Sequence, residues 1–210
     1  MDFEHSLRLF IAFPLPSETQ EYLAKIQASL HKEDAADSFR WIKAQNTHIT
    51  LHFLGDIAAG EATIPKITGA MQRAVEAFRQ GGTASSPIRC KLGKPGAFPS
   101  KKNPRVLWIG LNEFMERRST HLLQYGKSLF DMLESELLSE GIQSHSSSYK
   151  PHITLGYRKR SSSDQDAAAL LANSRTAVKE LVFSLGSICL FKSYVTQDGR
   201  THEVIFSQPL

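Results

Sequence analysis

The tetrapeptide His-Ile-Thr-Leu occurs twice in this sequence of 210 residues, beginning at His48 and at His152. Polar and apolar residues alternate in both copies, which is typical of a strand in which residues two apart share a face. Each strand would therefore present an imidazole and a hydroxyl on one face, His48 with Thr50 and His152 with Thr154. Because the copies lie about half the chain length apart, they indicate two related lobes. If these lobes pack around a pseudo-two-fold axis, their polar faces would line one cleft from both sides.

Two imidazoles on opposite sides of a cleft can carry out paired acid and base chemistry. The ordinary pKa of histidine is near 6.5, so at neutral pH one ring can accept a proton while its partner donates one. Threonine hydroxyls can donate hydrogen bonds to the non-bridging oxygens of a phosphate. Displacement at phosphorus needs a proton taken from the entering oxygen and a proton given to the leaving oxygen. The two motifs meet this need without a metal ion.

The other histidines give weaker signals. His52 lies four residues after His48, which suits two metal ligands on a helix but leaves them about 13 Å apart on a strand. We therefore expect no metal site, and the alternation of the strand predicts that His52 lies on the wall of the cleft. The remaining histidines have no comparable setting and are expected on the surface: His5, His31, His121, His145 and His202.

The elements around the two motifs follow a similar order in each half of the chain. The expected strands are residues 7–13, 39–42, 48–55, 88–92, 106–111, 152–157, 181–185, 188–194 and 203–206. The expected helices are residues 17–30, 64–78, 120–140 and 164–173, and a long Gly/Pro/Lys loop is expected between the strands that end at residue 92 and begin at residue 106. Nothing resembling a linker separates the halves. We therefore expect residues 1–210 to form a single bilobal domain of two successive halves, with lobes around the motifs at 48–51 and 152–155.

The composition excludes several classes of protein. Hydrophobic residues at 41% and charged residues at 22% are ordinary values for a globular chain, and no apolar run approaches the about 18 residues of a membrane-spanning helix. Asp2 and Glu4 precede the first apolar stretch and Pro14 ends it, which favours a first strand over a signal peptide. Cys90 and Cys189 both lie in strand-like runs, so we expect buried free thiols and a cytoplasmic location.

The net charge of +4 permits a polyanionic partner without requiring one. Much of the basic character is concentrated in two runs, one between Lys91 and Arg105 and the other at residues 158–160. These runs are either solvated loops or surfaces that attract a polyanion, and the sequence alone leaves both interpretations open.

The whole chain resembles the RNA 2′,3′-cyclic phosphodiesterases, also called 2′-5′ RNA ligases, of the 2H phosphoesterase superfamily. The segments that carry the resemblance are, in order, RLFIAFPLP, WIKAQNTHITLHFLGD, PRVLWIGL, YKPHITLGY and LFKSYVTQDGRTHEVI. The resemblance implies an α+β fold with two pseudo-symmetric lobes, each an antiparallel sheet with outer helices, and an active-site groove between them. It implies hydrolysis of an RNA 2′,3′-cyclic phosphodiester to a 2′-phosphomonoester. In that reaction His48 is the proton donor, His152 is the proton acceptor, and Thr50 and Thr154 bind the phosphate.

One position departs from the family. Many members have a phosphate-binding arginine five residues after the second motif's histidine, where this chain has Tyr157. Alternation along the strand places Arg158 on the face of His152, so Arg158 is expected to substitute for that arginine unless a bulge intervenes. The same reasoning assigns Phe53 to the core in preference to stacking on a base.

Three other activities stay open beside the leading one. The enzyme could act on small cyclic phosphates such as ADP-ribose cyclic phosphate, or join RNA halves through a 2′-5′ linkage as a side activity. It could also be a non-catalytic module that binds RNA ends, although intact histidines and threonines in both motifs argue against this. The expected partner is an RNA end bearing a 2′,3′-cyclic phosphate. We expect no cofactor, no membrane association and no obligatory protein partner, and thus a monomer.

Overall fold

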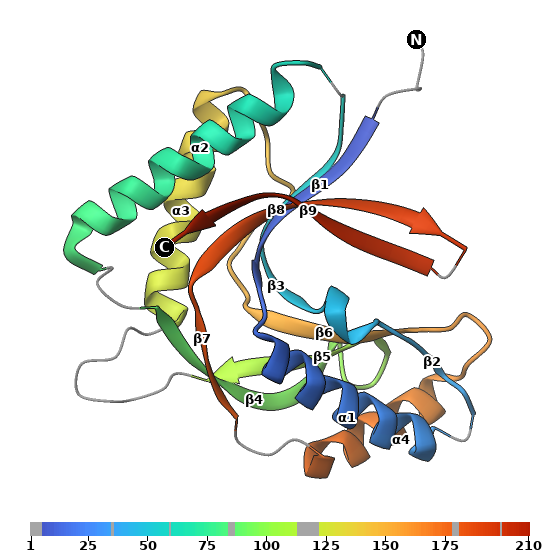
Figure 1. Ribbon diagram of the computed structural model, residues 1–210. Coiled ribbons are helices and arrows are strands. Elements are labelled where there is room, and N and C mark those ends of the chain that lie inside the picture. The colour runs from blue at the N-terminus through green and yellow to red at the C-terminus, as the bar shows by residue number, and fades with distance from the viewer. Residues whose placement is uncertain are drawn as a thin grey trace.

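The computed structural model describes residues 6–34, 36–58, 60–83, 87–112, 122–177, 181–197 and 199–210 (Figure 1). The strands in these residues are β1 (Ser6–Pro14), β2 (Phe39–Trp41), β3 (His48–Ala58), β4 (Ile88–Pro99), β5 (Pro104–Asn112), β6 (His152–Arg158), β7 (Val182–Leu185), β8 (Ser187–Thr196) and β9 (Gly199–Pro209). The helices are α1 (Ser17–Glu33), α2 (Thr63–Phe78), α3 (Leu122–Ser139) and α4 (Asp164–Ala177), with short helical turns at η2 (Ala44–Asn46) and η3 (Arg79–Thr83). These elements confirm the expected α+β class. Residues 120, 121 and 198, which belong to the predicted third helix and to the last hairpin, lie outside the described residues.

The strands pair antiparallel in one curled sheet, in the order β7-β4-β5-β6-β3-β1-β8-β9, with β2 added beside β6. The sheet is weakest in its middle, where β3 and β6 share a single register pair, Ile49 with Ile153. This join divides the sheet into a first lobe of β1, β3, β8 and β9 and a second lobe of β2, β4, β5, β6 and β7. The expected arrangement of two antiparallel lobes is confirmed.

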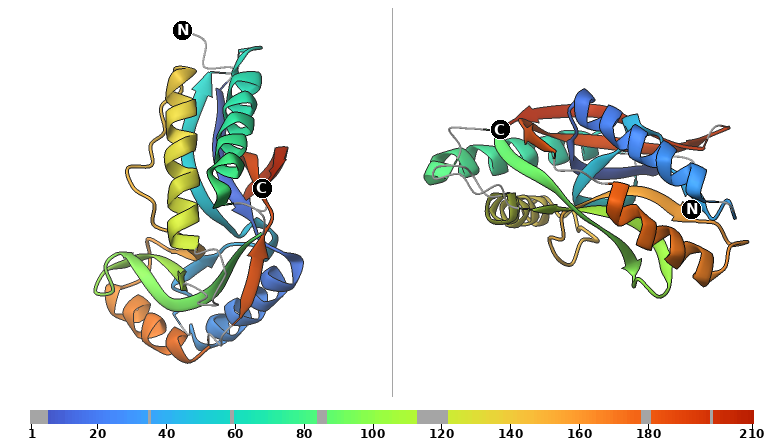
Figure 2. Two further views of the ribbon diagram at one scale, coloured as in Figure 1. Left: turned by 90° about the vertical axis from the view of Figure 1, so that its left-hand side faces the viewer. Right: turned by 90° about the horizontal axis from the view of Figure 1, so that it is seen from below.

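Each lobe carries two helices on its outer face. Helices α2 and α3 lie side by side and cover the first lobe, whereas α1 and α4 lie side by side and cover the second (Figures 1 and 2). The chain therefore crosses between the lobes, because β1 belongs to the first lobe and the next helix packs on the second. The expectation that the lobes are two successive halves of the chain is wrong. The repeated order of elements predicts their types, but it does not determine which part of the sheet each strand joins.

The core lies between the sheet and these helices. In both motif strands the isoleucine and leucine are almost completely buried, as the alternation predicts: Ile49, Leu51, Ile153 and Leu155. Helix α1 is also bound to the second motif, because the side-chain amide of Gln27 donates to the carbonyl oxygen of Leu155 at 2.9 Å. The motifs thus face the helices with their apolar residues and leave their polar residues on the other face of the sheet.

The segment expected to be a long loop between β4 and β5 is mostly strand. Strand β4 continues to Pro99, and a short turn of residues 100–103 leads into β5. Pro95 is compatible with this strand because β7 pairs with β4 only as far as Lys91, so β4 is an edge strand beyond that point. Gly96 is required because a Cβ there would lie 2.3 Å from the Trp108 ring on β5. The glycines and prolines that led us to expect a loop are here part of a bent edge strand.

Cys90 and Cys189 are buried free thiols, as expected. Within the part of the chain that the structure describes, no helix is both long enough and apolar enough to cross a membrane.

Candidate active site

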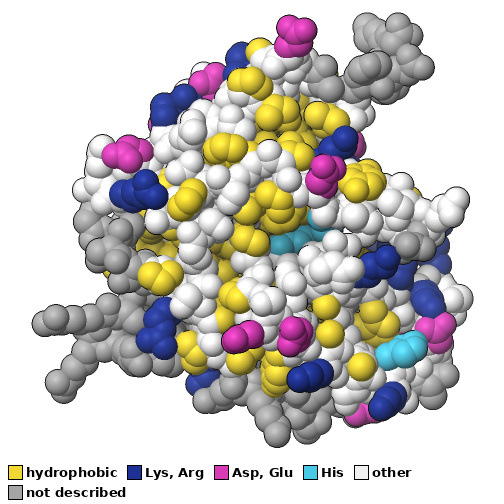
Figure 3. Space-filling view, in the orientation of Figure 1, with side chains coloured by type: hydrophobic (Ala, Val, Ile, Leu, Met, Phe, Trp, Pro, Cys, Tyr) yellow, Lys and Arg dark blue, Asp and Glu magenta, His cyan; other side chains and the backbone are white. Residues whose placement is uncertain are grey.

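A cavity of about 560 Å³ opens between the two lobes. His48 and Thr50 line it from β3, and His152 and Thr154 line it from β6. On the face shown in Figure 3, histidine surface lies in a hollow between the upper and lower parts of the molecule, and Lys and Arg side chains gather to its right. The structure therefore brings together the four residues that the sequence predicted as a site.

The pairing of β3 with β6 explains this juxtaposition. The two strands run antiparallel and meet at Ile49 and Ile153, the second residue of each motif. Residues on either side of this pair point to the opposite face of the sheet, because side chains alternate along a strand. The histidine and threonine of one motif thus face the same space as those of the other, on either side of a pseudo-two-fold axis.

The two catalytic candidates are oriented in the same way. Nδ1 of His48 lies 2.7 Å from the carbonyl oxygen of Asn46, and Nδ1 of His152 lies 2.7 Å from that of Lys150. A carbonyl oxygen can only accept a hydrogen bond, so Nδ1 carries a hydrogen in both rings. Nε2 is therefore the nitrogen that can take up or release a proton in each histidine.

His48 lies on an aromatic floor made by Phe10 and Phe191, whose rings stack at 4.9 Å. The centroid of the His48 ring is 4.7 Å from that of Phe10 and 5.9 Å from that of Phe191. The pKa of His48 is lowered to about 4, mainly by burial on this floor and in smaller part by the nearby His202 and His152 when they are charged. His48 is accordingly neutral at pH 7 in the free protein.

His152 has a different aromatic environment on the second lobe. Its ring centroid is 5.0 Å from that of Phe98 and 6.1 Å from that of Trp108. Burial also lowers the pKa of His152, but the His152 ring is less deeply buried than the His48 ring. The hydrogen bond to the Lys150 carbonyl oxygen acts in the opposite direction and raises this pKa. The two histidines thus share an orientation but differ in how far each is removed from water.

A β-bulge follows the threonine of the first motif. Ala12 of β1 pairs with Thr50 and Ile11 pairs with His52, so Leu51 has no partner on β1. Such an extra residue reverses the alternation beyond it, and Leu51 and His52 both point into the core. Phe53 therefore takes the cleft side of the strand.

Two predictions are corrected by this bulge. His52 is completely buried, with its ring nitrogens 2.9 Å from the Ser144 hydroxyl and 2.9 Å from the Phe130 carbonyl oxygen, so it is a structural residue and not part of the cleft wall. Phe53 lines the cavity, with the Arg8 guanidinium 4.7 Å from its ring centre, so its assignment to the core is wrong. The pattern of one strand cannot reveal a bulge, which exists only relative to the neighbouring strand.

The second motif contains the equivalent bulge. Leu107 of β5 pairs with Gly156 and Trp108 pairs with Thr154, which leaves Leu155 without a partner on β5. Tyr157 consequently lines the cavity, at the position equivalent to Phe53.

Arg158 is directed elsewhere. Its guanidinium forms an ion pair with Asp164 at the start of α4, and it is not among the residues that line the cavity. The structure therefore does not bring Arg158 to the cleft. The expectation that it would lie there is wrong, because the bulge in β6 reverses the alternation before Arg158 is reached.

The cleft contains residues that the sequence did not predict. His202 lines it, with its ring edge-on to His48 at 5.3 Å between centroids, so its assignment to the surface is wrong. The end of the β8–β9 hairpin lines the cleft with Gly199, Arg200 and His202, and the Asn46 side-chain amide donates to the Arg200 carbonyl oxygen at 3.0 Å. This contact joins residues far apart in the chain, and nothing in the local sequence around His202 indicates it.

The positive charge of the cleft also comes from unexpected residues. The cations that line the cavity are Arg8, Arg40, Lys43 and Arg200. Neither basic run singled out in the sequence lines the cavity, and Lys101 and Lys102 lie at the turn between β4 and β5. The only signal in the sequence that Arg40 would lie in the cleft is its position a few residues before the first motif.

Comparisons with known sequences agree with the motifs. Residues 13–108 match the sequence model of the LigT-like phosphoesterases. The RNA 2′,3′-cyclic phosphodiesterase of Aquifex aeolicus (strain VF5) is 27% identical over 199 residues, which cover 95% of each chain. The protein of the same name from Methanocaldococcus jannaschii is 26% identical over 204 residues, which cover 95% of this chain and 98% of that protein.

Solved structures share the fold. Escherichia coli LigT in complex with 3′-AMP superposes with a TM-score of 0.65 at 20% identity, over 98% of this chain and 99% of LigT. A protein of Thermus thermophilus superposes with a TM-score of 0.64 at 23% identity, over 97% of both chains. The chain is thus similar to the LigT-like phosphoesterases of the 2H superfamily in sequence, and it shares the fold of LigT along nearly its whole length.

Proposed function

We propose that this protein hydrolyses RNA ends that carry a 2′,3′-cyclic phosphate and produces 2′-phosphomonoesters. The observation that carries the proposal is one cavity lined by His48, Thr50, His152 and Thr154 from two paired strands. The names of the relatives in Aquifex aeolicus and Methanocaldococcus jannaschii support the choice of substrate.

In the proposed reaction His152 acts as the base. Its Nε2 takes a proton from a water molecule as the water oxygen attacks phosphorus, and its less buried position favours access by that water. The bond from phosphorus to the 3′ oxygen breaks, while the bond to the 2′ oxygen remains. The product therefore carries a 2′-phosphate and a free 3′-hydroxyl.

His48 acts as the acid that protonates the departing 3′ oxygen. It must first gain a proton, because burial holds its pKa at about 4 in the free protein. A bound phosphate places negative charge beside the ring and raises this pKa. Once protonated, the imidazolium can donate this proton to the departing oxygen and return to the neutral form that burial favours.

Thr50 and Thr154 hold the phosphate between the two histidines. Each hydroxyl can donate one hydrogen bond to a non-bridging oxygen, and a hydrogen bond to a charged group contributes about 1.5–3 kcal/mol. Because the threonines come from different lobes, they fix the phosphorus between Nε2 of His48 and Nε2 of His152.

The same geometry supports 2′-5′ ligation as a side activity. If an RNA 5′-hydroxyl takes the place of water, His152 removes its proton and its oxygen attacks phosphorus. His48 again protonates the 3′ oxygen, and the two RNAs become joined through a 2′-5′ linkage. Ligation would then require the same two histidines as hydrolysis.

The test is a short RNA ending in a 2′,3′-cyclic phosphate, incubated with the protein and a metal chelator. We expect a 2′-phosphate as the product, and we expect His48→Ala and His152→Ala each to reduce the rate by about 10²–10⁴-fold. A 3′-phosphate product, or full activity in both variants, would refute the proposal.

A further inference from the structure

The outer wall of the second lobe carries an arginine and an aromatic side chain opposite each other. Arg40 of β2 is the register partner of Tyr157 of β6, and its guanidinium lies 6.0 Å from the centre of the tyrosine ring. Both residues line the same cavity as His152 and Thr154. We call this pair the Arg40–Tyr157 plate.

The close approach of β2 depends on Gly156. Trp41 is the register partner of Gly156, and a Cβ at Gly156 would lie 3.1 Å from the carbonyl oxygen of Arg40. Even the smallest side chain there would require β2 to shift by a few tenths of an ångström. The glycine of the second motif strand thus allows β2 to pack closely against β6.

The charge of Arg40 is available to a ligand. Nearby cations on the same rim are compensated, since Arg158 forms an ion pair with Asp164 and Lys159 forms one with Asp37. Among the described residues, no carboxylate lies within ion-pair distance of Arg40. Its guanidinium therefore presents positive charge to the cavity, beside a phenol hydroxyl that can also donate a hydrogen bond.

The first lobe contains an equivalent pair whose arginine is neutralised by a carboxylate. Arg8 lies 4.7 Å from the centre of the Phe53 ring, but Arg8 also forms an ion pair with Asp56 at 3.0 Å. Phe53 has no hydroxyl to donate. The two lobes therefore repeat the arrangement of an arginine over an aromatic ring, whereas the second-lobe plate is the better suited to an anion.

The Arg40–Tyr157 plate lies further along β6 than Thr154, the residue proposed to hold the reacting phosphate. Tyr157 follows Thr154 by three residues, which is at most about 10 Å along a strand. A phosphate held by Thr154 is thus separated from the plate by a spacing that suits the next anionic group of the same ligand. In an RNA that ends in a 2′,3′-cyclic phosphate, the nearest other phosphate is on the 5′ oxygen of the same ribose.

We propose that Arg40 and Tyr157 form an outer subsite that binds the 5′-phosphate of the terminal nucleotide. This inference rests on the proposed function, and it defines the substrate class of the same cleft. The preferred substrates are nucleotides and RNA ends with a phosphate on the 5′ oxygen, and nucleoside 2′,3′-cyclic phosphates without it are poorer substrates.

The experiment compares two substrates that differ by one group, adenosine 2′,3′-cyclic phosphate and the same molecule with a 5′-phosphate. We expect the 5′-phosphate to raise kcat/KM about tenfold, as one charge-assisted hydrogen bond would. Arg40→Met should reduce this gain to less than about twofold, while Arg40→Lys should keep part of the gain. Raising the salt concentration should also reduce the gain in the native protein.

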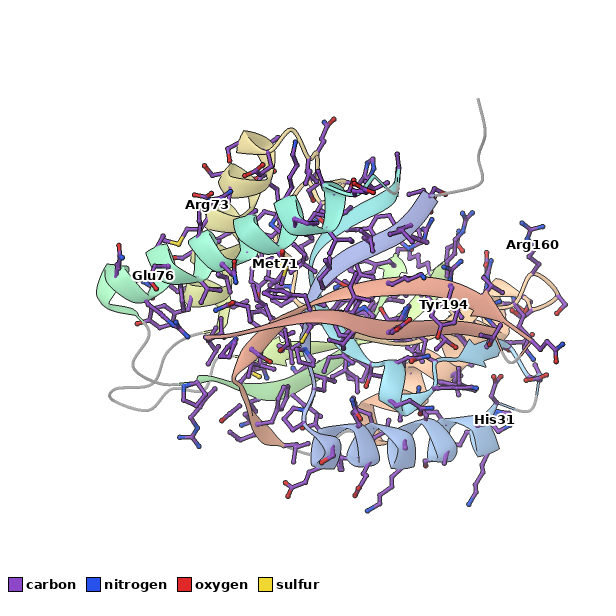
Figure 4. All side chains as sticks on the ribbon, turned by 45° about the horizontal axis from the view of Figure 1, so that its top comes forward. His31, Met71, Arg73, Glu76, Arg160 and Tyr194 are labelled. Carbon is purple, nitrogen blue, oxygen red and sulfur yellow. The ribbon has the colours of Figure 1, made fainter. Side chains whose placement is uncertain are left out.

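Arg160→Met is the matched control. Arg160 is exposed on the same rim, points away from the molecule in Figure 4 and does not line the cavity, so this variant loses the same charge and should keep the full gain. If Arg40→Met keeps the full gain in kcat/KM from the 5′-phosphate, for example because kcat/KM falls equally for both substrates, the inference is overturned. The proposed hydrolysis itself would not be affected by this result.

A binding measurement separates this inference from the proposed function. Adenosine 2′-phosphate and adenosine 2′,5′-bisphosphate are titrated into the native protein and into Arg40→Met by calorimetry. We expect the native protein to prefer the bisphosphate about tenfold and Arg40→Met to lose that preference. If the protein hydrolyses neither substrate, the proposed function fails, but a preference for the bisphosphate that depends on Arg40 still supports the subsite. If the native protein shows no such preference, the subsite is overturned.

Discussion

Protonation of His48 should follow the binding of an anion in the cleft. Burial on the aromatic floor of Phe10 and Phe191 holds the pKa of His48 at about 4, so at pH 6 about one molecule in a hundred carries a proton on this ring. A unit negative charge about 4 Å away contributes about 4 kcal/mol at an effective dielectric constant of about 20, which corresponds to about three pKa units. We therefore expect the pKa of His48 to rise from about 4 to about 7 when an anion binds.

Nuclear magnetic resonance can measure this change for each histidine separately. Inorganic sulfate serves as the probe, because its charge does not change across the neutral range. We expect the Cε1 proton of His48 to titrate near pH 4 in the free protein and at about pH 7 or above at saturating sulfate, because sulfate carries two negative charges. His31 on α1 is exposed and far along the surface, so its chemical shift at a fixed pH should not respond to sulfate (Figure 4).

Two results would refute the reasoning. A His48 pKa near 6.5 in the free protein would show that the aromatic floor does not exclude water. A low pKa that sulfate leaves unchanged would show that the anion does not bind beside His48, and the role of this residue as the acid would then fail.

Three further predictions follow from the same structure. His202→Phe should keep the edge-on packing against His48 but remove a nearby positive charge at acidic pH, so the pKa of His48 should rise in the same resonance titration. The free energy of unfolding should fall by up to about 3 kcal/mol between pH 6.5 and pH 4, because the unfolded chain binds a proton on His48 in this range and the folded protein does not. Urea denaturation at several pH values measures this fall, and His48→Gln should make the free energy of unfolding less dependent on pH. Gly96→Ala should lower the free energy of unfolding by about 1–3 kcal/mol, because the added Cβ would lie 2.3 Å from the Trp108 ring; a Tm equal to that of the native protein would contradict this account of the β4–β5 edge.

The parts of the site that depend on one strand were predictable. The repeated tetrapeptide placed His48, Thr50, His152 and Thr154 correctly in one cavity, because the alternation of side chains over four residues is a property of the strand itself. The burial of the isoleucine and leucine in each copy followed from the same pattern.

The parts that depend on neighbouring strands were not predictable. The bulge at Leu51 exists because of the register between β1 and β3, and it exchanges the faces of His52 and Phe53. The bulge in β6 has the same effect and directs Arg158 to Asp164, while Tyr157 takes the cleft side.

Long-range contacts account for the other missed residues. Arg40 reaches the cleft because β2 adds to the edge of β6, which lies more than half the chain away in sequence. His202 reaches it because the β8–β9 hairpin is held over η2 by the bond from Asn46 to Arg200. Each depends on chain segments that have no local signal for meeting one another.

The central claim is that histidines from two lobes act as one catalytic unit. The most direct test is the rate of hydrolysis of an RNA 2′,3′-cyclic phosphate by His48→Ala, by His152→Ala and by the double variant. Residues that act as a unit are strongly non-additive, so we expect each single variant to lose about 10²–10⁴-fold and the double variant to lose little more. Losses that multiply in the double variant would show that the two histidines act independently and would contradict the account.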